Sequence, residues 1–216
     1  MADSIGPPRT SSATMSRVSE APPAAGNFLG SAIYGGVEAF VTKHGPAAAH
    51  AVIAKLSAGS RAYVRPNVPA LGILGAKRYP YAFVGELVRT MASVARADED
   101  VFCREYAAAG IDYTLATVNR VVLRYAVTPQ ALAARAQELW TMFHDAGRVT
   151  IRTISETEYV AVLSDWPSHD VTVCKVCMEA RRRVVERTGV KDVEVRREKC
   201  QAWGHDVCET RVRWTR

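Results

Sequence analysis

Between residues 28 and 147, apolar side chains recur every three or four positions, which is the spacing of one face of an α-helix. In the first predicted helix, over 31–44, this face consists of Ile33, Val37, Phe40 and Val41. Gly45-Pro46 interrupts the pattern, and a proline is favoured at the first position of a new helix. Further helices are predicted from residue 46, over 83–94, from 98 to a stop at Gly110, over 111–125 and over 130–146.

The period changes after Gly147, where apolar and polar residues begin to alternate. Val149 and Ile151 lie between charged or polar neighbours, and residues 159–163 form a second β-rich run. A helix over 171–188 follows, and two more alternating runs begin near Val193 and at Cys208. The pattern predicts an α+β fold, with N-terminal helices followed by a β-β-α-β-β module that forms an antiparallel sheet.

Residues 1–27 are rich in proline and in small or polar residues. Such a segment buries too little apolar surface to offset the entropy lost on ordering, so we predict a disordered tail over 1–27. The remaining chain, 28–216, is predicted to be a single domain. The 216-residue chain is 48% hydrophobic, which is ordinary for a globular protein.

The net charge of +6 is spread along the chain, and only residues 175–199 are densely basic. We interpret this as a solvated positive surface, and nucleic acid is not an expected partner. No apolar stretch reaches the roughly 18 residues of a membrane span. The start, Met1-Ala-Asp-Ser, lacks the basic and apolar regions of a secretory signal. We therefore expect a cytoplasmic protein.

Four of the five cysteines fall into two pairs. Cys174 and Cys177 are three residues apart at the start of a predicted helix, so their thiols share one face. Cys200 and Cys208 flank a turn between two predicted strands, and a hairpin would bring them together. These four cysteines predict one structural metal site with zinc as the cofactor, because closed Cys₄ coordination is typical of structural zinc.

Two other interpretations of these cysteines stay open. Cysteine is among the most buried residue types, so all four could be small core side chains. A redox pair is the third possibility, although a reducing cytosol favours metal binding over a disulfide. His205, in the turn between Cys200 and Cys208, is a candidate replacement ligand, and Cys103 is expected in the core.

The C-terminal segments 193–204 and 208–214 resemble the signature of 4-vinyl reductase-type domains, and Cys174, Cys200 and Cys208 match its three cysteine positions. The resemblance implies the ligand-binding fold of nitric-oxide-signalling and Golgi-transport proteins. It also implies a homodimer with a zinc-stabilised pocket for a small apolar molecule. Arg197 stands where the family usually has a glutamate that can bind metal, so Cys177 is inferred to be the fourth ligand.

The fold implied by this resemblance encloses an apolar pocket between the helices and the sheet. Aromatic side chains are the candidates to line such a pocket, and a histidine among them could hydrogen-bond a ligand. The candidates are Tyr113, Trp140, Phe143, His144, Tyr159 and Trp166. The competing interpretation for each of them is ordinary core packing.

These observations favour a sensing or regulatory domain that binds an apolar or aromatic ligand and signals through a partner. The alternatives are a protein–protein interaction adaptor without a ligand and a reductase acting on a tetrapyrrole. An enzyme is the less favoured class, because the sequence has no dinucleotide fingerprint, no nucleophile elbow and no evident acid–base pair. A Tyr-x-Ser-x-Arg set that would hold haem propionates is also missing from the sequence.

Overall fold

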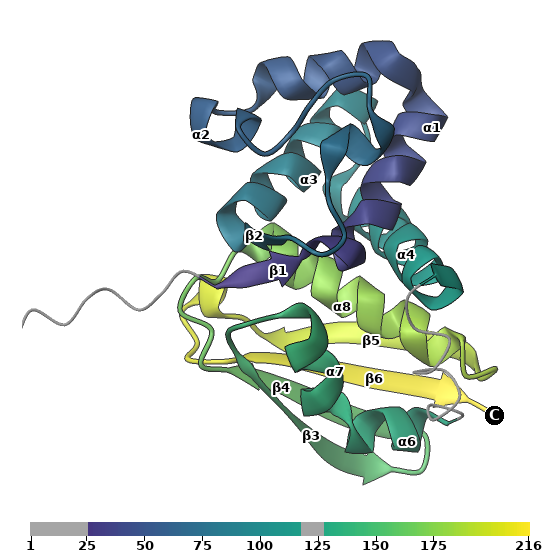
Figure 1. Cartoon of the computed structure of the whole chain (residues 1–216). Coiled ribbons are helices and arrows are strands. Elements are labelled where there is room, and N and C mark those ends of the chain that lie inside the picture. The colour runs from purple at the N-terminus through teal and green to yellow at the C-terminus, as the bar shows by residue number, and fades with distance from the viewer. Residues whose placement is uncertain (1–25, 118–127) are drawn as a thin grey trace, which may run out of the picture.

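A computed structural model of the chain describes residues 26–117 and 128–216. The N-terminal half forms a helical layer, shown in purple and blue-green in Figure 1. Its long helices are α1 (Gly30–Lys55), α3 (Tyr81–Ala95) and α4 (Glu99–Thr117). Its short elements are α2 (Ala58–Arg61), the 3₁₀ turn η1 (Pro69–Gly72) and the antiparallel pair β1 (Asn27–Leu29) and β2 (Arg78–Pro80).

Within the described ranges, the C-terminal half forms a four-stranded antiparallel sheet in the order β3-β4-β6-β5. The strands are β3 (Arg148–Ser155), β4 (Glu158–Ser164), β5 (Lys191–Lys199) and β6 (Cys208–Thr215). Helix α8 (Val171–Glu186) lies between this sheet and the helical layer (Figure 1), and the 3₁₀ turn η2 (Gln201–Trp203) connects β5 to β6. The predicted α+β fold and its β-β-α-β-β module are confirmed.

The start of α8 is fixed to α3 through Asp170. The Asp170 carboxylate accepts hydrogen bonds from the backbone N–H groups of Thr172 (2.9 Å) and Val173 (3.0 Å), which caps the helix. Arg89 of α3 donates to both oxygens of the same carboxylate, at 3.1 and 2.9 Å. A Cβ atom at Gly85 would lie 2.4 Å from this carboxylate, so the glycine leaves the space that Asp170 occupies.

Two of the predicted helices differ from the structure in their boundaries. The predicted stop at Gly110 was wrong, because α4 continues through it to Thr117. A Cβ atom at Gly110 would lie 2.9 Å from the carbonyl oxygen of Ala32, so this glycine allows α1 and α4 to approach closely. The helix predicted over 130–146 is divided into α6 (Pro129–Ala134) and α7 (Ala136–Phe143).

The break predicted at Gly45-Pro46 is present as a kink inside α1, where Gly45 has a φ of 77°. Residues 118–125 of one predicted helix, and residues 1–25 of the predicted tail, lie outside the described residues. The last two residues of that predicted tail are described, and Asn27 belongs to β1. Cys103 is buried in the core, as predicted. Across the two described ranges, none of the helices combines the length and apolarity needed to cross a bilayer.

The close packing of α1 against α4 predicts that a side chain at the position of Gly35 destabilises the protein. A Cβ atom there would lie 2.4 Å from the Cβ of Tyr113 and 2.7 Å from the carbonyl oxygen of Ala109. We expect Gly35→Ala to lower the free energy of unfolding by about 1–3 kcal/mol, because overpacking outweighs the gain in helix propensity. Chemical denaturation of the purified protein measures this change.

Gly59 in α2 provides the matched control, because a Cβ atom there meets nothing within 4 Å. We expect Gly59→Ala to leave stability unchanged or raise it by up to about 1 kcal/mol. Equal effects of the two substitutions would show that the α1–α4 contact does not require a glycine.

Candidate functional site

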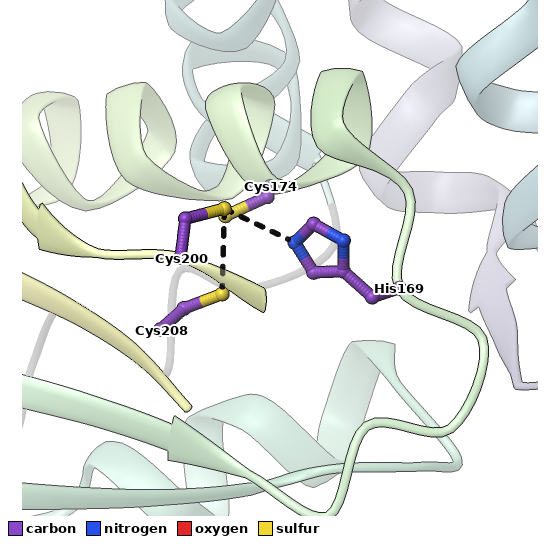
Figure 2. A group of neighbouring side chains, drawn as sticks. All are labelled: His169, Cys174, Cys200 and Cys208. Atoms are coloured by element: carbon purple, nitrogen blue, oxygen red, sulfur yellow. Dashed lines mark hydrogen bonds between the residues drawn. The ribbon is translucent and has the colours of Figure 1, made fainter. Parts of the chain in front are cut away.

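Three cysteines and one histidine meet where the β5–β6 hairpin approaches the start of α8 (Figure 2). Cys174 lies in the first turn of α8, Cys200 and Cys208 flank the hairpin turn, and His169 precedes the helix cap. One potential ligand atom from each residue lies within 4.8 Å of the others. The Sγ atom of Cys200 lies 3.8 Å from that of Cys208 and 3.5 Å from Nε2 of His169. We call these four residues the Cys/His cluster.

The surroundings of this cluster favour the thiolate form of Cys208. The pKa of Cys208 is lowered because Cys174 and His169 donate hydrogen bonds to its sulfur, which outweighs the effect of burial. The pKa of Cys174 is raised by its hydrogen bond to Cys208 and by burial, and the pKa of Cys200 is raised by burial, although the positive charge of Arg197 acts in the opposite direction on both. The Nε and Nη2 atoms of Arg197 are buried and have no hydrogen-bond partner among the described residues. Thiolates and an imidazole in this arrangement could hold a transition-metal ion that prefers soft ligands.

The structure brings together three of the four cysteines that the sequence indicated as metal ligands. Cys177 is not one of the cluster residues, and His169 occupies the fourth position. His205 is not part of the cluster either. Sequence reasoning missed His169 because it lies in an irregular segment where no periodicity places side chains. The available signal was its position, one residue before the Asp170 helix cap and five before Cys174.

The composition of the cluster can be tested with Co²⁺, whose thiolate complexes absorb in the near ultraviolet. We expect the reduced protein to bind Co²⁺ and develop thiolate-to-cobalt charge transfer. Cys174→Ser and His169→Asn should each weaken binding by more than about tenfold, since even outer partners of metal ligands contribute about 10–100-fold. Cys177→Ser is the matched control and should bind like the parent protein. Loss of binding in Cys177→Ser alone would reverse this assignment.

A second feature is an apolar cavity of about 190 Å³ beside α8. Its lining comes from β1, α1, α4, α6, α7, β3, β4 and α8. Four of the six predicted pocket residues line it: Trp140, Phe143, His144 and Tyr159. Cys177 also lines this cavity, so the structure places it with the pocket rather than with the Cys/His cluster.

The other two predicted pocket residues do not line the cavity. Tyr113 stacks on Tyr34 between α4 and α1, with ring centroids 4.7 Å apart. Trp166 is fully buried and packs edge-on against Trp140 at 5.8 Å and against His169 of the Cys/His cluster at 5.1 Å. These two side chains pack against their neighbours, in agreement with the competing interpretation of ordinary core packing.

His144 is the most constrained polar group of the cavity. Its ring is parallel to Trp140 at 3.5 Å and stacks on Phe28 at 4.3 Å, and its Nδ1 shares a 2.9 Å hydrogen bond with the Tyr81 hydroxyl. Burial lowers the pKa of His144 well below its usual value, and the charges of Arg78 and Arg181 lower it further. The imidazole is therefore neutral at neutral pH.

Two more titratable groups of the cavity are also neutral. Burial raises the pKa of the Cys177 thiol to about 12 and that of the Tyr159 hydroxyl to about 12, although Arg181 lowers both. Arg181 is the charged residue among those that line the cavity in the described parts of the chain. As far as its lining is described, the cavity is thus an apolar space with one positive charge, that of Arg181.

The layers of this fold are those of H-NOX proteins. One solved structure, an H-NOX protein from S. oneidensis in the Fe(II)NO ligation state, has a TM-score of 0.64 at 11% identity and covers 86% of this chain and 99% of that chain. The unliganded Fe(II) H-NOX protein from K. algicida has a TM-score of 0.67 at 10% identity, covering 87% and 97%.

An oxygen-binding H-NOX domain related to soluble guanylate cyclases has a TM-score of 0.59 at 8% identity, covering 87% of this chain and 95% of that chain. At these identities the likeness shows the fold alone. No protein-family model and no curated protein matches the chain. The 4-vinyl reductase-type assignment therefore stays a prediction.

The predicted zinc cofactor is corrected by these neighbours. The names of the S. oneidensis and K. algicida proteins specify Fe(II), the name of a further H-NOX structure mentions heme distortion, and none of these names specifies zinc. The Cys/His cluster remains as a group of potential ligands, without zinc as its assigned ion.

Haem does not fit the residues that are present. The cavity of about 190 Å³ is smaller than the roughly 300–1,000 Å³ pockets of drug-sized ligands, and haem is a large ligand of that kind. Trp140 and Phe28 cover both faces of the His144 ring, and among the described lining residues Arg181 is the single cation available for two propionates. The interior is filled by aromatic side chains where a macrocycle would need space.

We accordingly expect hemin added to the purified protein to produce no sharp, stoichiometric Soret band. Absorption spectroscopy during a hemin titration measures this, and the His144→Ala variant controls for surface adsorption because it should give the same spectrum. A one-to-one Soret transition that His144→Ala abolishes would show that the cavity opens for haem.

Proposed function

We propose that this chain is a small-molecule-sensing domain that binds an apolar or aromatic ligand in the cavity beside α8 and signals through a partner. The observation that carries the proposal is the cavity itself, because a densely packed core of this size needs no such space. An engineered apolar cavity of about 150 Å³ accommodates benzene. The 190 Å³ cavity therefore suits a monocyclic aromatic molecule with a short substituent.

The position of α8 supports a signalling role over simple storage of a ligand. Residues along α8 line the cavity, and the same helix is joined to α4 by an ion pair of 2.7 Å between Arg183 and Asp112. Its first turn contributes Cys174 to the Cys/His cluster. A ligand that shifts α8 would change the contacts between α8 and the helical layer. A partner protein that binds the helical layer could then respond to the ligand.

A homodimer is the assembly that the sequence resemblance implies, and it remains part of this proposal. The adaptor alternative differs from the sensing proposal in its use of the cavity, because an adaptor without a ligand needs no open cavity. The reductase alternative needs a reactive group, but the cavity holds neutral Cys177, Tyr159 and His144. Filling the cavity therefore separates ligand sensing from the adaptor alternative.

Ala180 of α8 lines the cavity, and Ala180→Leu would project three more carbon atoms into it. We expect this variant to keep the stability of the parent protein, because the new side chain enters existing space. It should weaken the binding of neutral aromatic probes such as cinnamamide, indole and 4-ethylphenol by more than about tenfold, since the same space is then occupied. Isothermal titration calorimetry measures the affinities.

Ala92 is the matched control, because it is 4% exposed in the core and does not line the cavity. Ala92→Leu should lower the free energy of unfolding by about 1–3 kcal/mol through overpacking, without a specific effect on ligand binding. If the parent protein binds none of the probes, the adaptor alternative gains over the sensing proposal.

A further inference from the structure

Arg181 differs from the other arginines of the α8 region. Arg182 pairs with Glu179 at 2.7 Å, Arg183 with Asp112 at 2.7 Å, and the Nε of Arg187 donates to Asp112 at 3.0 Å. No hydrogen bond or ion pair joins the Arg181 guanidinium to any residue in 26–117 or 128–216. Arg181 lines the cavity instead.

The periodicity of α8 explains this position. Arg181 follows Cys177 by four residues and precedes Val185 by four, so the three side chains share one helix face, and all three line the cavity. No aspartate or glutamate belongs to the described lining of the cavity. An unpaired cation at the edge of an apolar space loses part of its hydration without an opposite charge in return.

A second polar group of the cavity is also without a partner. The Tyr159 side chain lines the cavity, and its hydroxyl forms no hydrogen bond with any residue that the structure describes. The hydroxyl is protonated, because burial raises its pKa to about 12, so it can donate a hydrogen bond. Arg181 and Tyr159 together present donors, while the rest of the lining is predominantly apolar.

We propose that the ligand is a small carboxylate with an apolar body, and that Arg181 binds its carboxylate while the body fills the cavity. A guanidinium matches a carboxylate with two parallel hydrogen bonds, and one cation neutralises one negative charge. A phosphate carries about 1.5 to 2 charges and would be neutralised only in part. The half-buried position of Arg181 leaves its guanidinium at the cavity edge, where a carboxylate can stay partly hydrated. This inference rests on the proposed sensing function and specifies its ligand class.

The experiment compares trans-cinnamate with trans-cinnamamide, which have nearly the same shape and differ in charge at pH 7.5. Calorimetry of the full chain should give the parent protein a clear preference for cinnamate. Arg181→Gln should weaken cinnamate binding by about tenfold to a hundredfold, the range for hydrogen bonds to charged groups, and change cinnamamide binding by less than about twofold. Arg181→Lys keeps the charge without the planar donor pair, so its affinity for cinnamate should lie between that of the parent protein and that of Arg181→Gln.

Arg152 provides the matched control, because it is an exposed arginine of β3 that does not line the cavity. Arg152→Gln removes the same charge and should leave both affinities unchanged. Thermal unfolding of each variant verifies that it is folded, and Arg181→Gln should be as stable as the parent protein because it breaks no ion pair.

The possible outcomes separate this inference from the proposed function. If cinnamamide binds and Arg181→Gln weakens both ligands equally, the carboxylate assignment is overturned and the sensing function stands. An equal loss of cinnamate affinity in Arg152→Gln would also overturn the assignment, because net charge would then explain the effect. If neither compound binds the parent protein, both the ligand class and the sensing function are contradicted.

Discussion

The Asp170 carboxylate fixes α8, and the two candidate sites depend on where α8 lies. One side chain caps the helix, receives two hydrogen bonds from Arg89 and fills the space beside Gly85. Buried or half-buried carboxylates are costly unless they are paired and hydrogen-bonded, and this one has both kinds of partner. Cys174, Cys177 and Arg181 then follow on successive turns. The first belongs to the Cys/His cluster, and the other two belong to the cavity.

The Cys/His cluster and the cavity are also in contact through aromatic rings. His169 packs against Trp166, Trp166 against Trp140, and Trp140 lies parallel to His144 in the cavity wall. Trp166 is 1% exposed, so this path runs through the packed interior. Protein interiors transmit displacements because they are close-packed. The segment that carries His169 and the wall of the cavity are thus held by one continuous set of packed rings.

The sequence predicted the features that depend on periodicity and chain proximity. Alternation with a period of two identified β3, β5 and β6, and a β-rich composition identified β4. The hairpin turn brought Cys200 and Cys208 together as expected. Spacing alone could not separate Cys174 from Cys177, because both lie on one helix face. Three residues advance a helix by about 4.5 Å, which is enough to move the second thiol from the cluster into the cavity. Gly110 was wrongly predicted to end a helix, because close packing of α1 and α4 also requires a glycine there.

The likeness to H-NOX proteins extends to the layers of the fold, and the interior of this chain decides what those layers enclose. The names of two of the matching H-NOX structures mention Fe(II) or heme. In this chain, Trp140, Phe28 and His144 form a stack between the helices and the sheet, beside a cavity of about 190 Å³. Function resides in the side chains that a fold presents rather than in the fold itself. Arg181 pairs with no described residue and lies at the edge of a small apolar space. It therefore indicates the class of ligand more directly than the arrangement of the surrounding helices and strands does.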